Sequence, residues 1–188
     1  PSFSQSLLLQ VEGRLQNLDI TVGLEMGAET ITFDQHHQFV RALYKIQARL
    51  ADQGGLYSDE DNISTQLLFF ALEELKELYY FTGIVRAYGS YFVSRSYVTS
   101  QGGEQLEIAF DNLTLSSEVL PKKILDIIGV EFTSNSEVKI SIDKFRHNIE
   151  ELARYLDEQV IQSDDINLNW DDYYRQSSHE INSLQDIR

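Results

Sequence analysis

Residues 64–98, STQLLFFALEELKELYYFTGIVRAYGSYFVSRSYV, form the stretch that decides the fold. Apolar side chains recur there at steps of three and four, the spacing that places them along one face of an α-helix. We predict one long helix that is kinked or broken near Gly83 or Gly89, because glycine weakens a helix interior. The apolar stripe consists of Leu67, Leu68, Ala71, Leu72, Leu75, Leu78, Tyr79, Val85, Tyr88 and Phe92.

The same period recurs on both sides of this stretch and predicts a mainly α-helical chain. Asp34 and Asp143 are suited to accept the free N–H groups at the start of a helix, and Pro121 is suited to a first helical turn. Gly54 and Gly55 are suited to end a helix, because glycine adopts the left-handed conformation readily. We therefore expect an antiparallel bundle of four or five helices. The other helices are predicted at residues 6–19, 35–52, 104–112, 122–128 and 144–161.

The hydrophobic period changes at residues 130–142. Apolar and polar residues alternate there on both sides of a polar segment, which is the pattern of two strands joined by a turn. The sequence therefore predicts one β-hairpin at about residues 130–142, which must pack on the helices or pair with another chain because a lone hairpin is marginal in water. The alternating apolar residues are Val130, Phe132, Val138, Ile140 and Ile142.

The chain is acidic, and its acidity deepens toward the C-terminus. It has 30 acidic and 15 basic side chains, for a net charge of -15. Such a charge argues against direct nucleic-acid binding and against docking on anionic lipid, since both need clustered Lys and Arg. Residues 163–188 are polar and poorly periodic. We expect a single helical domain over residues 1–162 and a polar C-terminal arm over 163–188, disordered or ordered only against a partner.

Cysteine is absent from the 188 residues, which excludes disulfides, thiolate metal sites and a cysteine nucleophile. The N-terminal segment has no basic residues before its run of leucines, so it does not resemble a secretory signal. The most apolar stretch is interrupted by Arg86 and Arg95, which argues against a membrane span. We expect a cytoplasmic or virion-associated protein without a signal peptide or transmembrane segment.

No catalytic motif stands out in the chain. The four histidines are not spaced to converge on one ion, so we expect neither a metal nor a cofactor. Glu73 and Glu77 share one helix face, and paired carboxylates of this kind serve di-metal or acid–base sites. The Glu-x-x-His pattern of such bundle sites is missing, and the prediction is a solvated helix face. We therefore expect no catalytic, cofactor-binding or metal-binding residues, and a protein that is not an enzyme.

The most distinctive feature is aromatic: residues 79–97 hold seven aromatic side chains. Tyrosine, tryptophan and arginine are enriched at binding hot spots, because each offers a broad contact face with a polar group. The alternative is a core helix whose tyrosine hydroxyls reach solvent. One helix cannot bury all seven rings on one face, so both interpretations stay open. The candidate interface residues are Tyr79, Tyr80, Arg86, Tyr88, Tyr91, Phe92, Arg95, Tyr97, Trp170, Tyr173 and Tyr174.

Residues 34–59, DQHHQFVRALYKIQARLADQGGLYSD, resemble the helix of phage head–tail adaptors of the tail tubular protein A type. In that family a helix of the form Leu-x-x-Ile-x-x-x-(Ile/Leu) ends at a glycine and an aromatic residue, followed by an acidic turn. The chain departs from the family at residues 22–25, which read VGLE where Ile-Gly-x-x-Pro is usual, and in a helical segment that replaces the family's sheet-forming middle. The resemblance implies a structural ring subunit without catalysis. The matching residues are Leu43, Ile46, Leu50, Gly54, Tyr57 and Asp59.

Three functional hypotheses follow from the sequence. The leading one is a non-enzymatic assembly protein, a homo-oligomeric ring subunit such as a phage head–tail connector. The alternative is an acidic protein-binding module, such as an inhibitor, an immunity protein or a DNA mimic, that acts on a basic partner. The third is a helical-bundle enzyme or cofactor carrier built on Glu73 and Glu77, which would need bound metal.

Overall fold

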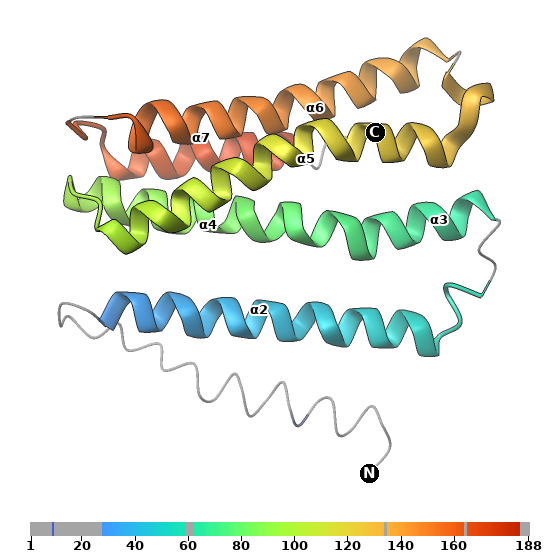
Figure 1. Cartoon of the computed structure of the whole chain (residues 1–188), viewed down its shortest axis with the longest axis horizontal. Helices are drawn as coiled ribbons and strands as arrows, with labels where there is room; N and C mark the ends of the chain where they lie inside the picture. Colours follow the sequence, from blue (N-terminus) through green and yellow to red (C-terminus); the bar gives the residue numbers. More distant parts are fainter. Residues whose placement is uncertain (1–8, 10–27, 59–61, 134, 164, 185–188) are drawn as a thin grey trace. The chain divides into compact units, whose positions relative to one another are not determined.

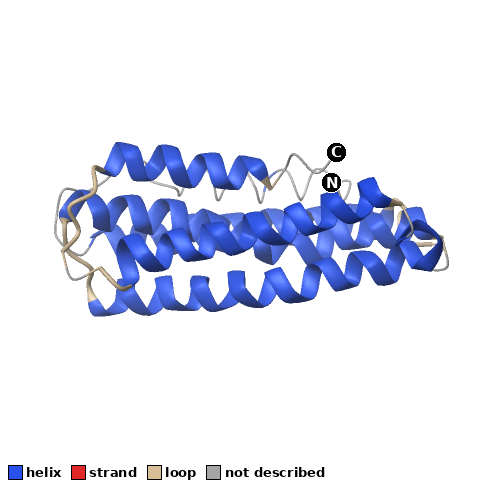
Figure 2. Ribbon diagram, turned by 90° about the horizontal axis from the view of Figure 1, so that it is seen from above, coloured by secondary structure: helices blue, strands red, loops and turns tan. Residues whose placement is uncertain are grey.

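The computed structural model describes Leu9 and residues 28–58, 62–133, 135–163 and 165–184. These residues are almost entirely helical, and none of them lies in a strand (Figure 2). The predicted mainly α-helical class is therefore confirmed. The contacts within the chain divide it into a first unit, Pro1–Asp59, and a second unit, Glu60–Arg188, whereas the sequence suggested a division at residue 162.

The first unit contains the helix α2, Ala28–Gln53. It is longer than predicted, so Asp34 lies inside the helix rather than at its start. The predicted glycine ending is confirmed: Gly55 has a φ of 68°, and the Leu56 N–H donates to the Ala51 carbonyl at 3.0 Å. This left-handed turn satisfies carbonyls that the last helical turn leaves free. The predicted helix over residues 6–19 lies, except for Leu9, outside the described residues.

The second unit is a bundle whose helical segments run in alternating directions, as Figure 1 shows. Its first long segment passes from α3 through a π-helical turn, η1, into α4, and α6 continues into a second π-helical turn, η2. The segment α5 contacts α4 and α6, and α7 contacts the same two helices, which closes the bundle. The elements are α3 (Ile63–Phe69), η1 (Phe70–Glu74), α4 (Leu75–Arg95), α5 (Ser100–Thr133), α6 (Ser136–Leu156), η2 (Asp157–Ile161) and α7 (Trp170–Ser183).

The long helix predicted over residues 64–98 is present, but its irregularity is not at Gly83 or Gly89. Both glycines lie within the regular helix α4, and the helix departs from α geometry at η1 instead. A π turn accommodates one extra residue per turn and thereby shifts which side chains face the core. The helix ends at Ser96, which adopts the left-handed conformation with a φ of 50°.

The helices predicted at 104–112 and 122–128 belong to one segment, α5. Pro121 lies inside this segment and is buried, rather than opening a new helix. Leu106, Leu113 and Leu120 are buried at steps of seven residues, which keeps the same side of α5 toward the core up to the proline. Gly129, with a φ of 74° and a ψ of 174°, breaks the helical geometry near the position at which the sequence suggested an ending.

The predicted β-hairpin is wrong, because the described residues of 130–142 are helical apart from the Asn135 cap. The side chain of Asn135 caps α6 by accepting a hydrogen bond from the backbone N–H two residues later, at 3.0 Å. Ile142 and Phe145 are buried at helical spacing, while Ile140 is 66% exposed. The exposed Ile140, midway between the half-buried Val138 and the buried Ile142, therefore produced an alternation that imitates a strand.

The predicted polar arm also differs from the structure, since most of its described residues form α7. The Asn169 side chain caps this helix, accepting from the Asp171 backbone N–H at 2.8 Å. Tyr173, Ser177 and Ile181 are buried at steps of four residues against the chain's own α4 and α6. The buried side of α7 includes a serine and a tyrosine, so the helical period of hydrophobic residues is weak in this segment. For this reason the sequence alone did not reveal the helix.

A helix and a hairpin over residues 136–142 predict different effects on stability when Ile140 and Ile142 are replaced. In a strand Ile140 and Ile142 would share one face, whereas in α6 only Ile142 is buried. Replacing Ile142 with Ala is expected to lower the free energy of unfolding by about 2–5 kcal/mol. The same change at Ile140 is expected to alter it by less than about 0.5 kcal/mol. Urea denaturation followed by circular dichroism measures both, and equal losses would contradict the helix.

Candidate protein-interaction surface

The structure divides the predicted interface residues by exposure into core, half-buried and exposed side chains. Three side chains belong to the core of the second unit: Tyr88, Phe92 and Tyr173. Four others are half-buried: Tyr79, Tyr80, Arg86 and Tyr91. The remaining four are exposed: Arg95, Tyr97, Trp170 and Tyr174.

Tyr173 joins three helices of the bundle. Its side chain is fully buried, and its hydroxyl donates a hydrogen bond to the Val85 carbonyl of α4 at 3.1 Å. Its ring stacks on Tyr155 of α6, with ring centroids 5.3 Å apart and an angle of 23° between the ring planes. Burial, aided by the proximity of Tyr155, raises the pKa of the Tyr173 hydroxyl far above its usual range. The group therefore stays protonated in the folded protein and can donate this hydrogen bond.

Glycine permits this arrangement at the point where α7 crosses α4. A Cβ built on Gly89 would overlap the hydroxyl and ring of Tyr173, so no other residue fits there without a shift of the tyrosine. The same relation recurs at the start of α5, where a Cβ on Gly102 would overlap the ring of Phe92. Gly83, on the same helix as Gly89, has nothing within 4 Å of its built Cβ. Of these two glycines of α4, only Gly89 is therefore at a tight approach.

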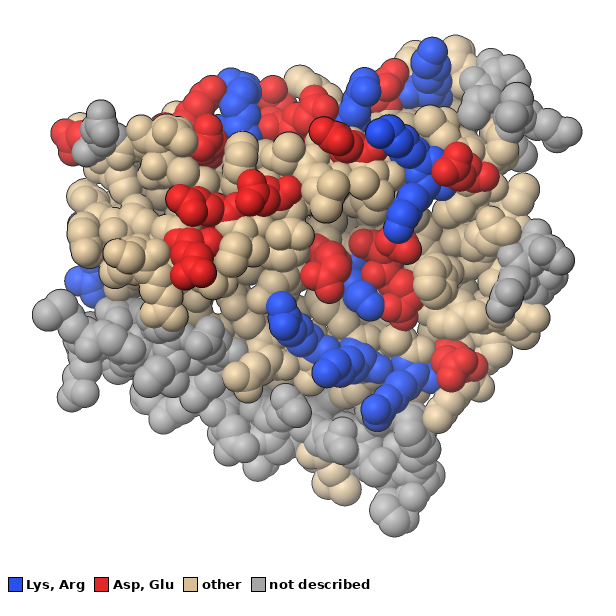
Figure 3. Space-filling model, in the orientation of Figure 1, with Lys and Arg blue, Asp and Glu red and all other residues tan. Residues whose placement is uncertain are grey.

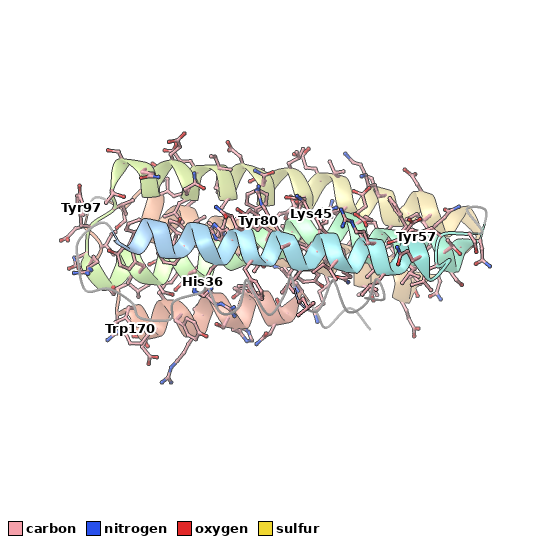
Figure 4. All side chains as sticks on the ribbon, turned by 90° about the horizontal axis from the view of Figure 1, so that it is seen from below. His36, Lys45, Tyr57, Tyr80, Tyr97 and Trp170 are labelled. Atoms are coloured by element: carbon pink, nitrogen blue, oxygen red, sulfur yellow. The ribbon has the colours of Figure 1, made fainter. Side chains whose placement is uncertain are left out.

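The exposed aromatic set consists of Tyr97, Trp170 and Tyr174, which are 65%, 52% and 44% exposed. Figure 4 places Tyr97 and Trp170 toward the same end of the second unit, where α4 ends and α7 begins. The Arg86 guanidinium lies over the ring of Tyr174, 5.7 Å from its centroid. This cation–π contact holds one face of the ring and leaves the rest of the side chain toward solvent.

A second arginine–aromatic pair lies on α4. The Arg95 guanidinium is 5.6 Å from the centroid of the Tyr91 ring, which also packs edge-on against Phe92 with ring centroids 5.2 Å apart. The exposed Arg95 and the half-buried Tyr91 thus form a pair in which Tyr91 packs on a core residue. Large, amphipathic side chains of this kind suit protein contacts.

Glu73, one of the two carboxylates of the alternative enzyme site, and its neighbour Glu74 each pair with a lysine. Glu73 accepts from the Lys76 ammonium at 2.5 Å, whereas Glu74 accepts from Lys123 of α5 at 2.6 Å. The hydrogen bond with Glu73 raises the pKa of Lys76, and the charges of Glu73, Glu77 and Glu74 act in the same direction. The π turn η1 contains Glu73 and Glu74, which pair with lysines of different helices. Among the described residues, no group of three or more potential ligands could hold a metal ion.

The sequence analysis missed an acidic side of α5. Figure 3 shows acidic side chains grouped over the N-terminal half of this helix. The apolar residues Ile108 and Leu115 lie on the same side and are 39% and 58% exposed. Steps of three and four between the acidic and apolar residues of this side of α5 are the signal that indicates it, whereas the net charge of the chain does not reveal it. Its acidic members are Glu104, Glu107, Asp111 and Glu118, all exposed.

Comparison of the chain with protein-family models, with curated proteins and with solved structures gave no match. None of the helices that the structure describes is both long enough and apolar enough to cross a membrane.

The Gly89–Tyr173 contact predicts opposite outcomes for two glycines of α4. Gly89→Ala is expected to lower the free energy of unfolding by about 1–3 kcal/mol, because the added methyl group displaces Tyr173. Gly83→Ala is the matched control and is expected to stabilise by up to about 1 kcal/mol, since alanine favours a helix interior. Thermal denaturation measures both changes. An unaffected Gly89→Ala protein would show that the contact is not tight.

The buried hydroxyl of Tyr173 predicts a dependence of stability on alkaline pH. A free tyrosine ionises near pH 10, so the unfolded chain loses this proton there while the folded chain keeps it. The stabilisation is present below about pH 10 and declines as the pH rises further. Tyr173→Phe is expected to cost about 1 kcal/mol at neutral pH and to flatten this decline. Urea midpoints measured at pH 7 and near pH 11 test this, and parallel pH profiles would contradict it.

Proposed function

We propose that this chain is a non-enzymatic assembly protein, a homo-oligomeric ring subunit such as a phage head–tail connector. The observation that carries the proposal is the exposed aromatic set of Tyr97, Trp170 and Tyr174. Residues 34–59, with their resemblance to head–tail adaptors, give the proposal its particular form. The helix they form ends at a left-handed glycine, as expected for such a segment.

The exposed aromatic set contrasts with the aromatic side chains in the core of the second unit. Phe92, Phe145 and Tyr173 of this unit are each at most 3% exposed, although Phe69 and Leu115, like the set, are also exposed. Leaving a tryptophan and two tyrosines in water forgoes the free energy of their burial, roughly 25 cal/mol for each Å² of apolar area. Covering them with a protein partner recovers that free energy, which is why exposed aromatic residues so often mark interfaces.

Light scattering coupled to size-exclusion chromatography tests the proposal over a wide range of protein concentration. We expect the wild-type chain to self-associate and the double variant Trp170→Ala/Tyr174→Ala to do so at least tenfold more weakly. The matched control is Leu115→Ala, which removes a similarly exposed apolar side chain from α5 and should leave self-association unchanged. A chain that stays monomeric over the whole range, alone and with the products of neighbouring genes, would contradict the proposal.

The acidic side of α5 favours a second candidate, a protein-binding module that acts on a basic partner. Glu104, Glu107 and Asp111 are all exposed there and have Ile108 between them. Contacts made by such a surface weaken as salt is added, whereas contacts made by the exposed aromatic set do not. Repeating the light scattering at low and high salt therefore separates the two. Complexes that dissociate at high salt, and that survive Trp170→Ala, would favour the acidic module.

A further inference from the structure

The helix α2 of the first unit carries a basic stripe, which consists of Arg41, Lys45 and Arg49. These residues are four positions apart, so they follow one another along one side of the helix, and all three are exposed. Between Asp34 and Asp52 the helix contains no acidic residue. Figure 3 shows basic side chains in a row over this helix. In a chain whose net charge is -15, the basic stripe is therefore a separate surface of opposite sign.

The acidic side of α5 has the opposite charge and offers a stretch of similar length. Its N-terminal part consists of Glu104, Glu107 and Asp111, all of them exposed. Residues 100–121 contain no lysine or arginine. At a rise of about 1.5 Å per residue, these acids extend over about 10 Å of helix and the basic stripe over about 12 Å. Ile108 lies among the acids and is 39% exposed, so the aliphatic stems of lysine and arginine can cover it.

Like charges are neighbours on both surfaces, whereas opposite charges are neighbours on α6. There Arg146 forms an ion pair with Asp143, and Arg154 forms one with Glu151. On the basic stripe, Lys45 lies four positions from an arginine on either side, and two of the three acids of α5 are likewise four positions apart. Like charges at this spacing destabilise a helix. A surface of opposite sign relieves the repulsion on both helices, because each charge then has counter-charges nearby.

We infer that the basic stripe of α2 binds the N-terminal part of the acidic side of α5 in a second copy of the chain. The inference rests on the proposed function and names the surfaces through which the copies meet. Both surfaces are exposed, and their charges and lengths match. Because the two surfaces differ, the contact can repeat from one copy to the next, as a ring requires. Tyr97 of the exposed aromatic set lies three positions before α5 begins, so one interface can include both.

Charge reversal on each surface, in two separate variants, tests the contact. Each variant alone places like charges against like, so light scattering should show self-association that is roughly tenfold or more weaker than that of the wild-type chain. In a mixture, each reversed surface meets a surface of opposite sign on the other variant. Association in the mixture should therefore exceed that of either variant alone by roughly tenfold or more. The variants are Arg41→Glu/Lys45→Glu/Arg49→Glu and Glu104→Lys/Glu107→Lys/Asp111→Lys.

Net charge does not explain such a recovery, because both variants keep a negative net charge. The matched control is Lys122→Glu/Lys139→Glu/Lys144→Glu, which reverses three exposed lysines of α5 and α6 and changes the net charge as much as the stripe variant does. This control should self-associate like the wild-type chain, and an equal loss would overturn the inference. Circular dichroism of each variant verifies that its helices are folded. A chain that carries all six interface changes should associate like wild type, because both of its surfaces have exchanged sign.

The outcomes separate this inference from the proposed function. A mixture that associates no more strongly than its components overturns the inference, even if the wild-type chain self-associates through its exposed aromatic set. The same result is expected if the stripe binds within its own chain, or if the acidic side serves a different, basic protein. Recovery in the mixture supports the inference. If Trp170→Ala/Tyr174→Ala then leaves wild-type association unchanged, the proposed role of the aromatic set is contradicted while the charged contact stands.

Discussion

The fold of the second unit depends on the contact between Tyr173 and Gly89. The tyrosine lies at the meeting point of α4, α6 and α7, where it stacks on one helix and donates a hydrogen bond to the backbone of another. Its position requires a glycine opposite, because any Cβ there would occupy the same space. The closure of the bundle by α7 thus combines a steric fit and one buried hydroxyl with the apolar burial of Ile181 and Leu184.

Sequence patterns predicted the helices wherever apolar residues dominate one face, as at Leu78 and Ile149, and failed where a single residue broke the pattern. The exposed Ile140 imitated a strand, and the buried Ser177 concealed the period of α7. The π turns also lay beyond prediction, because residues 70–74 have an ordinary helical composition. Periodicity describes average burial along a helix, so it cannot anticipate a residue whose burial depends on a partner from a distant segment.

Prediction from the sequence is limited in the same way for individual residues of the candidate interface. The sequence identified the right residue types, but Tyr173 and Tyr174 are neighbours with opposite environments, one fully buried and the other 44% exposed. Neighbouring residues on a helix point about 100° apart, so only the phase of α7 against its groove distinguishes them. That phase is set by Gly89, which lies more than eighty positions earlier in the chain. The aromatic content of the sequence therefore predicts that the protein has exposed aromatic rings. The packing of the helices decides which rings are exposed and which are buried.

The π turn at Phe70–Glu74 has a consequence for how this chain tolerates changes in length. A π turn holds one residue more than the α-helix on either side, so it acts as an absorbed insertion. Deleting one residue there would restore a continuous α-helix and rotate α3 by about 100° about its axis relative to α4. Because α3 and α4 both contact α5, such a rotation would present different side chains of α3 to that helix. The relative rotation of α3 and α4 is thus set at a single turn, where Glu74 forms an ion pair with Lys123 of α5.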